Sequence, residues 1–237
     1  MKAALTIAER ELKTYFLSPV GYFVIACFLF LASYLFYLPL AVVGQDSLRQ
    51  WTYNIVIILI IMVPALTMRL IAEERRTGTV EVLATSPVTD AQIVVGKFLG
   101  CLAFYAAMLA FTFVYPIILT RVGKPEMGPI FASYLGLFLF GASFVAIGLL
   151  ASAMSKSQVI GFVTAFVVLL FLFLLAWMAQ TGSGGWLGAL IGYVGIQQHL
   201  ENFSKGIIDT KDIIYYLSIV ALCLLLSIRA MQAWKWR

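Results

Sequence analysis

Charged residues are scarce in this chain, and their scarcity excludes most soluble folds. Only 11% of the 237 residues are Asp, Glu, Lys or Arg, and 62% are hydrophobic. An ordinary soluble domain carries roughly 25% charged residues. We therefore expect an all-α integral membrane protein, in which every backbone hydrogen bond is made within the spanning helices.

Cysteine and histidine are also rare, which argues against a metal site. The three cysteines, Cys27, Cys101 and Cys223, are odd in number, lie in apolar stretches and lack metal-ligand spacing, so we interpret them as small packing residues. The single histidine, His199, has Glu201 nearby and leaves a metal or proton site open. A lone histidine without neighbouring ligands is more often a hydrogen-bonded structural residue.

The chain lacks the phosphate-binding loop G-x-x-x-x-G-K-[ST] of ATPases. Gly96-Lys97 is followed by Phe98, and the glycine-rich run at 182–185 has no lysine after it. We therefore expect this chain to bind no cofactor and no ATP by itself.

Uncharged stretches are long enough for six membrane spans. A bilayer core about 30 Å thick needs about 20 mostly apolar residues per helix. Six segments fit: 20–43, 52–71, 98–119, 131–152, 158–179 and 213–230, although the sixth has only 16 residues (213–228) between Asp212 and Arg229 and would need interfacial residues at both ends. The sixth is the weakest, and the first is too long for a cleaved signal peptide. No charged residue or histidine lies at the centre of a span, which argues against a self-powered secondary carrier.

The distribution of Lys and Arg predicts the orientation. Six spans place both termini on one side, and the loops on that side hold most of the 16 basic residues. These are Lys2, Arg10, Lys13, Arg69, Arg75, Arg76, Lys97, Lys156, Arg229, Lys235 and Arg237. The positive-inside rule then predicts cytoplasmic termini. The net charge of +5 follows from this bias, so we expect no nucleic-acid partner.

The segment before the first span has the pattern of an amphipathic helix over residues 1–17. Its apolar positions recur at helical spacing: Leu5, Ala8, Leu12, Tyr15 and Phe16. Charged positions occupy the other face: Lys2, Glu9, Arg10 and Lys13. Ser18-Pro19 should end the helix, because proline disfavours helical geometry in the residue before it. We interpret the segment as an interfacial helix; the alternative is a frayed, charged terminus that only sets orientation.

The loop from 72 to 97 is charged and lies between two long apolar segments. We expect a short surface helix over 79–85, ended by Pro87, and a new helix that begins with a capping box of Thr89 and Gln92 and has Asp90 in its first turn. Such a rigid projection would transmit force from a cytoplasmic partner to two spans. The alternative is an ordinary positive-inside loop.

Small residues and prolines mark places of close packing or bending. Gly141, Gly148, Ser152 and Ser155 share one face of the fourth span and its exit, which favours tight helix packing and leaves a cargo path as the alternative. Pro64 and Pro116 would bend the second and third spans, either as moving parts or as static kinks.

The segment 180–212 is too apolar for an ordinary loop and too rich in glycine to span comfortably. Glycines recur in it at helical spacing: Gly185, Gly188, Gly192 and Gly195. We interpret it as a re-entrant or interfacial hairpin on the outer side.

Three stretches resemble those of ABC-2-type transporter permeases, and within that family the gliding-motility and nitrous-oxide-accessory branch. RELKTYFLSPVGY resembles the family's amphipathic elbow, AEERRTGTVEVLATSPVTDAQIVVGKF its coupling loop, and HLENFSKGIIDTKDIIYYLS the segment before its last span. The likeness covers almost the whole chain in the family's order. The chain departs from the pattern at Lys205, where many relatives carry arginine, and in its final Trp-Lys-Trp-Arg.

The resemblance implies roles for three groups of residues. ATPase-coupling residues would be Glu73, Glu74, Arg75, Arg76, Gly78, Thr79, Glu81, Pro87 and Asp90. The interfacial helix would contribute Arg10, Glu11, Lys13 and Tyr15. An extracytoplasmic gate would include His199, Phe203, Gly206 and Asp209.

The resemblance also implies a function. A single transmembrane domain, residues 1–237, would serve as one permease half in a bacterial cytoplasmic membrane, paired with a second identical or sister permease subunit. Two separate cytoplasmic ATPase subunits would bind ATP and Mg²⁺ and drive transport, with export as the expected direction. The alternatives are a membrane anchor that transmits force to an envelope partner without moving cargo, and a secondary carrier or channel.

Overall fold

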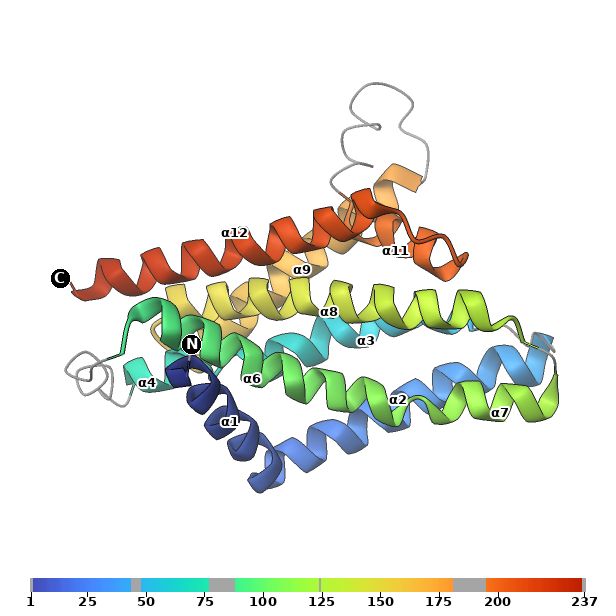
Figure 1. The fold of residues 1–237 in the computed structure, drawn as a ribbon, viewed down its shortest axis with the longest axis horizontal. Coiled ribbons are helices and arrows are strands. Elements are labelled where there is room, and N and C mark those ends of the chain that lie inside the picture. The colour runs from blue at the N-terminus through green and yellow to red at the C-terminus, as the bar shows by residue number, and fades with distance from the viewer. Residues whose placement is uncertain (1, 44–47, 77–87, 124, 181–194, 236–237) are drawn as a thin grey trace.

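The computed structural model describes residues 2–43, 48–76, 88–123, 125–180 and 195–235, and these residues form helices and short connections without any strand (Figure 1). In chain order the helices are α1 (Lys2–Leu17), α2 (Pro19–Val43), α3 (Arg49–Thr67), α4 (Ala72–Arg76), α6 (Asp90–Phe111), α7 (Val114–Val122), α8 (Met127–Met154), α9 (Gln158–Gln180), α11 (Ile196–Ser204) and α12 (Thr210–Lys235). The prediction of an all-α fold is confirmed.

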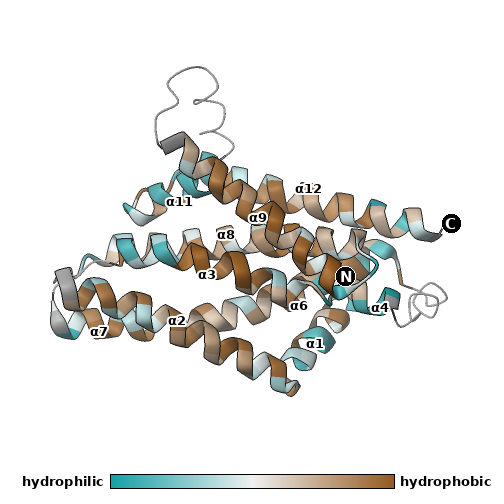
Figure 2. Cartoon of the chain, turned by 180° about the vertical axis from the view of Figure 1, so that it is seen from behind, coloured by the Kyte–Doolittle hydropathy of each residue, from teal (hydrophilic) through white to brown (hydrophobic). Residues whose placement is uncertain are grey.

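Within the described ranges, six helical segments are long and apolar enough to cross a membrane, by length and composition. They are Pro19–Ala41, Arg49–Arg75, Asp90–Arg121, Met127–Met154, Gln158–Met178 and Thr210–Trp234. Figure 2 shows long brown, hydrophobic stretches along these helices, with teal, hydrophilic residues mostly near their ends. The six predicted spans are therefore confirmed, and α1 ends before Pro19 as expected.

The last span is longer than the run of uncharged residues suggested. It begins at Thr210 and includes Asp212, whose side chain is fully buried. Asn202 Nδ2 donates to Asp212 Oδ2 over 2.8 Å, and His199 Nδ1 lies 2.6 Å from Asp212 Oδ1. These partners compensate for burial of the Asp212 carboxylate, so the helix can include this residue. A count of uncharged residues, by contrast, ends the span at Asp212.

The centre of the molecule is formed by α8 and α3, the two spans with the largest buried share. Helix α8 packs against α3, α6, α9, α11 and α12. Added methyl groups would meet Tyr105 at Gly141 and Thr67 at Gly148. The predicted small-residue face of this span is thus filled by neighbouring side chains, which supports close packing over a cargo path.

Both chain ends and α4 lie at one end of the helical bundle, on the left in Figure 1, and α7, α11 and the start of α8 lie toward the other. We call these the termini end and the opposite end.

The third span is broken between α6 and α7, at Thr112 and Phe113. Pro116 lies four residues after Thr112 and has no N–H with which to continue the helical ladder. The Thr112 carbonyl accepts hydrogen bonds from the Tyr115 N–H (3.0 Å) and from the Tyr134 hydroxyl (2.8 Å) of α8. By contrast, α3 continues through Pro64 to Thr67.

We expect Tyr134→Phe to destabilise the protein by about 1 kcal/mol, because it removes the hydrogen bond from α8 that supports this break. The thermal unfolding midpoint of the purified protein in detergent measures the effect. Tyr22→Phe, which alters an exposed hydroxyl, is the matched control. Equal unfolding midpoints for the two variants would show that the hydrogen bond from Tyr134 does not stabilise the interruption between α6 and α7.

Candidate functional site

At the termini end, α1 packs along α6 through small residues. A methyl group added at Gly96 would meet the Ala4 carbonyl, and one added at Gly100 would meet the Ala8 carbonyl. The absence of side chains at both glycines allows the two helices to approach closely. The predicted amphipathic helix is confirmed as a helix, and α6 is its main partner.

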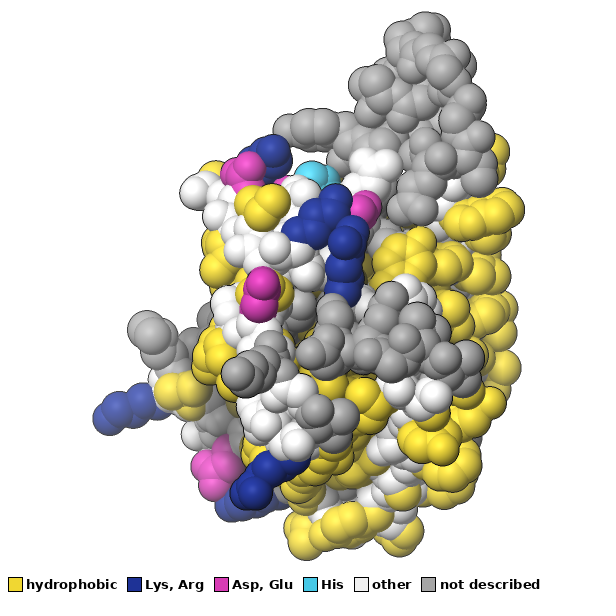
Figure 3. All heavy atoms as spheres, turned by 90° about the vertical axis from the view of Figure 1, so that its right-hand side faces the viewer, with side chains coloured by type: hydrophobic (Ala, Val, Ile, Leu, Met, Phe, Trp, Pro, Cys, Tyr) yellow, Lys and Arg dark blue, Asp and Glu magenta, His cyan; other side chains and the backbone are white. Residues whose placement is uncertain are grey.

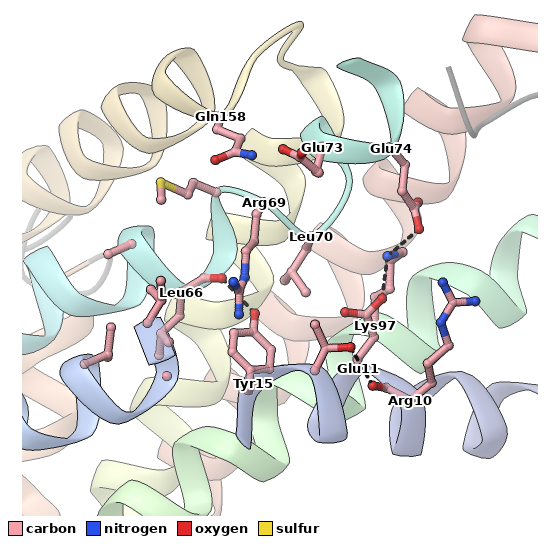
Figure 4. Close-up of a pocket in the computed structure, with 16 residues that line it drawn as sticks. Arg10, Glu11, Tyr15, Leu66, Arg69, Leu70, Glu73, Glu74, Lys97 and Gln158 are labelled. Atoms are coloured by element: carbon pink, nitrogen blue, oxygen red, sulfur yellow. Dashed lines mark hydrogen bonds and ion pairs between the residues drawn. The ribbon is translucent and has the colours of Figure 1, made fainter. Parts of the chain in front are cut away.

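Tyr15 fastens the end of α1 to two spans. Its hydroxyl donates to the Leu66 carbonyl over 2.7 Å, and its ring stacks on Phe104 with centroids 4.7 Å apart. The Arg69 guanidinium lies 4.5 Å from the ring centroid (Figure 4). Burial raises the pKa of the Tyr15 hydroxyl well above its usual value, so the residue acts as a neutral donor.

Lys97 joins three helices through a buried cluster of charges. Its side chain is only 4% exposed, and its Nζ lies 2.7 Å from Glu11 Oε1 and 2.8 Å from Glu74 Oε1. Glu11 belongs to α1, Glu74 to α4 and Lys97 to α6; dashed lines in Figure 4 mark both contacts. We call these three residues the Lys97 cluster. It connects α1 to the helices at the two ends of the predicted coupling loop, α4 and the first turns of α6.

Ser152, near the end of α8, holds the junction of α3 and α4. Its fully buried hydroxyl oxygen accepts the N–H groups of Ile71 and Ala72, each over 3.1 Å, and its hydroxyl donates to the Met68 carbonyl over 3.0 Å. These bonds satisfy backbone groups where one helix ends and the next begins. The direction of α4 is therefore fixed by the central span.

Arg75 of α4 also contacts the last span. Its guanidinium donates to the Ser155 carbonyl over 3.3 Å and lies 4.0 Å from the centroid of a Trp234 ring. The structure thus places this predicted coupling residue against the ends of α8 and α12, in a cation–π contact with the latter.

The helix predicted at the end of the loop, which continues into the third span, begins as expected. Thr89 and Gln92 form a reciprocal capping box, and Asp90 lies in the first turn of α6. Arg76 is the last residue of α4. The predicted surface helix at 79–85 lies outside the described residues, as do four predicted coupling residues: Gly78, Thr79, Glu81 and Pro87.

At the opposite end, His199 lies in a hydrogen-bonded cluster. Besides its 2.6 Å contact with Asp212, its ring stacks on Tyr215 with centroids 4.0 Å apart. Figure 3 shows basic, blue side chains and acidic, magenta ones near the cyan histidine on this end. The interpretation of His199 as a hydrogen-bonded residue is confirmed; the described residues contain no group of three metal-ligating side chains.

The other predicted gate residues lie in and after α11. Phe203 is fully buried against Gly136 of α8. Gly206 turns the chain with a φ of 83°, a conformation that favours glycine. Asp209 pairs with Lys211 Nζ over 2.9 Å, and the hydrogen bond from that side chain lowers the pKa of the Asp209 carboxyl. Most of the predicted re-entrant segment, 181–194, lies outside the described residues.

Sequence reasoning missed Lys97, Ser152 and Trp234 as members of this site. Lys97 was counted among loop charges, whereas the structure buries it. A signal was present, because Lys97 follows the buried Ile93 by four residues on the same face of the helix. No pattern in the residues around Ser152 indicates that its side chain bonds to the backbone between α3 and α4, 80 residues away in the sequence.

Comparisons with known proteins agree on one family. The family profile described as "ABC-2 family transporter protein" matches residues 43–228. A segment of 100 residues is 32% identical to the "Probable multidrug ABC transporter permease YbhR" of Escherichia coli strain K12, and equally to that of strain O157:H7. The match covers 42% of this chain and 27% of that permease, so the likeness extends over about a quarter of the relative's length.

Proposed function

This chain belongs to the ABC-2 family of transporter proteins, and we propose that it is a permease subunit moved by ATP hydrolysis on separate ATPase subunits. Two cytoplasmic ATPases and a second permease half, identical or related, would complete the transporter in a bacterial inner membrane. Export is the proposed direction, and the multidrug description of the E. coli relative supports it. The quoted stretches favour the gliding-motility and nitrous-oxide-accessory branch.

The observation that supports this proposal is that both ends of the predicted coupling loop, α4 and the first turns of α6, are bonded to the rest of the helical bundle. The Lys97 cluster ties α4 to α6 and α1, and Ser152 ties the start of α4 to α8. A push on residues 77–87 would therefore reach α3 and α6 together, since packed helices move as rigid bodies. In this proposal the termini end faces the cytoplasm, where the ATPases bind.

We expect Arg76→Glu to weaken association with the ATPase subunit by about tenfold, because charge reversal at an interface places like charges together. Glu74 is a poorer target, since its carboxylate also holds Lys97. Arg121→Glu makes the same change at an exposed site of the opposite end and serves as the control. The measurement is ATPase co-purification, followed by ATP-dependent cargo movement in vesicles.

The outcomes separate the candidate functions. Unchanged association and transport in Arg76→Glu would contradict the proposed contact. A native complex that hydrolyses ATP in vesicles but translocates no solute would favour the force-transmitting anchor, and flux without nucleotide would favour a carrier or channel.

A further inference from the structure

Gln197, in the first turn of α11, carries a buried amide that needs a hydrogen-bond partner. The residue is only 2% exposed. Within the described part of the chain, neither Oε1 nor Nε2 of its side chain has a protein group to bond. An amide removed from bulk water without any hydrogen bond is destabilising. A small polar ligand at this position would satisfy it.

A small cavity lies beside Gln197, between α11 and the start of α3. It gives the centre of a water-sized sphere about 10 Å³ in which to move. One bound water needs roughly 10–15 Å³ by this measure, so the space is the size of one water and too small to enclose an organic ligand. Two residues of α3 and four of α11 line it: Thr52, Tyr53, Gln197, Leu200, Glu201 and Ser204.

Thr52 can supply the contact on the side of α3. The residue is fully buried, and its hydroxyl donates to the Leu48 carbonyl over 3.0 Å. That bond uses the only hydrogen of the hydroxyl, so Thr52 Oγ1 is left as an acceptor. A water molecule has two hydrogens to donate and can also accept, and bound waters typically make about three hydrogen bonds.

We propose that this cavity binds one ordered water that joins α11 to α3. The water donates to Thr52 Oγ1 and to Gln197 Oε1, and it accepts from Gln197 Nε2. It therefore satisfies both atoms of the buried amide and makes three hydrogen bonds, two to α11 and one to α3.

The proposed water gives α11 a different attachment on each side. On α8, Phe203 packs directly against Gly136, and on α12 the Tyr216 hydroxyl donates to the Ile196 carbonyl over 2.9 Å. On α3, the contact of Arg49 with Glu201 is 3.6 Å long and its side chains are 55% and 38% exposed. The contact between α11 and α3 is thus the hydrated side of α11.

The first experiment compares thermal unfolding midpoints of the full-length chain in detergent. We expect Gln197→Leu to lower the midpoint by about 2–4 °C, because it removes the hydrogen bonds of the water to the amide. A dry, unpaired amide predicts the opposite sign, since leucine would then replace a destabilising polar group. An unchanged or higher midpoint in Gln197→Leu would overturn the proposal.

A double-mutant cycle locates the water between the two helices. Thr52→Val should also lower the midpoint, and the double variant with Gln197→Leu should lose clearly less than the sum, because both changes release the same water. Thr67→Val is the matched control: this fully buried threonine lies at the other end of α3 and donates to the Val63 carbonyl over 2.9 Å. Its effect should add to that of Gln197→Leu. Additive losses for Thr52 and Gln197 would contradict a shared water.

An experimental density map of the unaltered full-length chain, at a resolution that shows ordered waters, gives a readout that does not depend on stability. A peak is expected within about 3.2 Å of Thr52 Oγ1 and of the Gln197 amide. Well-defined side chains without such a peak would overturn the proposal. Continuous density too large for one water would assign the site to a detergent or lipid group and would also overturn it.

Discussion

Lys97→Met is expected to lower the free energy of unfolding by about 3 kcal/mol, because it removes the ammonium group between two carboxylates. Breaking a buried ion pair by deleting one partner costs about 3–5 kcal/mol. The lower end applies here, since the side chains of Glu11 and Glu74 are still 20% and 19% exposed and water reaches them. Thermal unfolding in detergent, followed by circular dichroism, measures the loss.

Two comparisons separate the lost charge from the lost packing. Lys156→Met, an exposed lysine at the same end, should change stability by no more than about 0.5 kcal/mol. The triple variant Glu11→Gln, Lys97→Met, Glu74→Gln should recover most of the loss, because neutral groups of similar volume carry no uncompensated charge. If Lys97→Met alone is as stable as the native protein, the cluster does not hold α1, α4 and α6 together.

The six spans were predictable because the cost of burying charge acts on each segment separately. Placing a charged side chain at the centre of a membrane costs several kcal/mol, so uncharged runs alone indicate where helices cross. The start of α6 was predictable for a similar reason: Thr89 and Gln92 satisfy each other's backbone groups within one turn.

The candidate site was predictable only in outline, because its contacts join distant parts of the chain. Glu11 and Lys97 are 86 residues apart, and Ser152 and Ile71 are 81 apart. Local spacing carries no information about such pairs. The positive-inside rule counts Lys97 as a loop charge, and only the packing of α1 on α6 reveals that it is buried. The same packing turns Glu11 inward toward Lys97.

Ser152→Ala should have an effect of similar size, with a loss of about 3 kcal/mol in the free energy of unfolding. The change removes the acceptor of two backbone N–H groups, of Ile71 and Ala72, and the donor to the Met68 carbonyl. A buried polar group left without a partner costs about 1–3 kcal/mol. Ile71 and Ala72 are fully buried, so water cannot readily replace the hydroxyl.

Ser155→Ala is the matched control, because the buried hydroxyl of this residue, which follows α8 directly, donates to the Ala151 carbonyl over 2.7 Å and makes no other hydrogen bond within the described part of the chain. That variant should lose about 1 kcal/mol or less. Hydrogen exchange adds a local readout: the amides of Ile71 and Ala72 should exchange faster in Ser152→Ala and at the native rate in Ser155→Ala. Protection of both amides in Ser152→Ala would contradict the role assigned to the hydroxyl.

The same substitution tests how α4 would work in the proposed transporter. If the Ser152 hydroxyl fixes the direction of α4, its loss lets α4 move without moving α3 and α8. In the proposed complex, Ser152→Ala should then leave ATP hydrolysis by the partner largely intact while the cargo moved per ATP falls severalfold. A proportional fall in both rates would instead indicate simple loss of folded protein, and an unchanged ratio at full stability would show that force reaches the spans by another route.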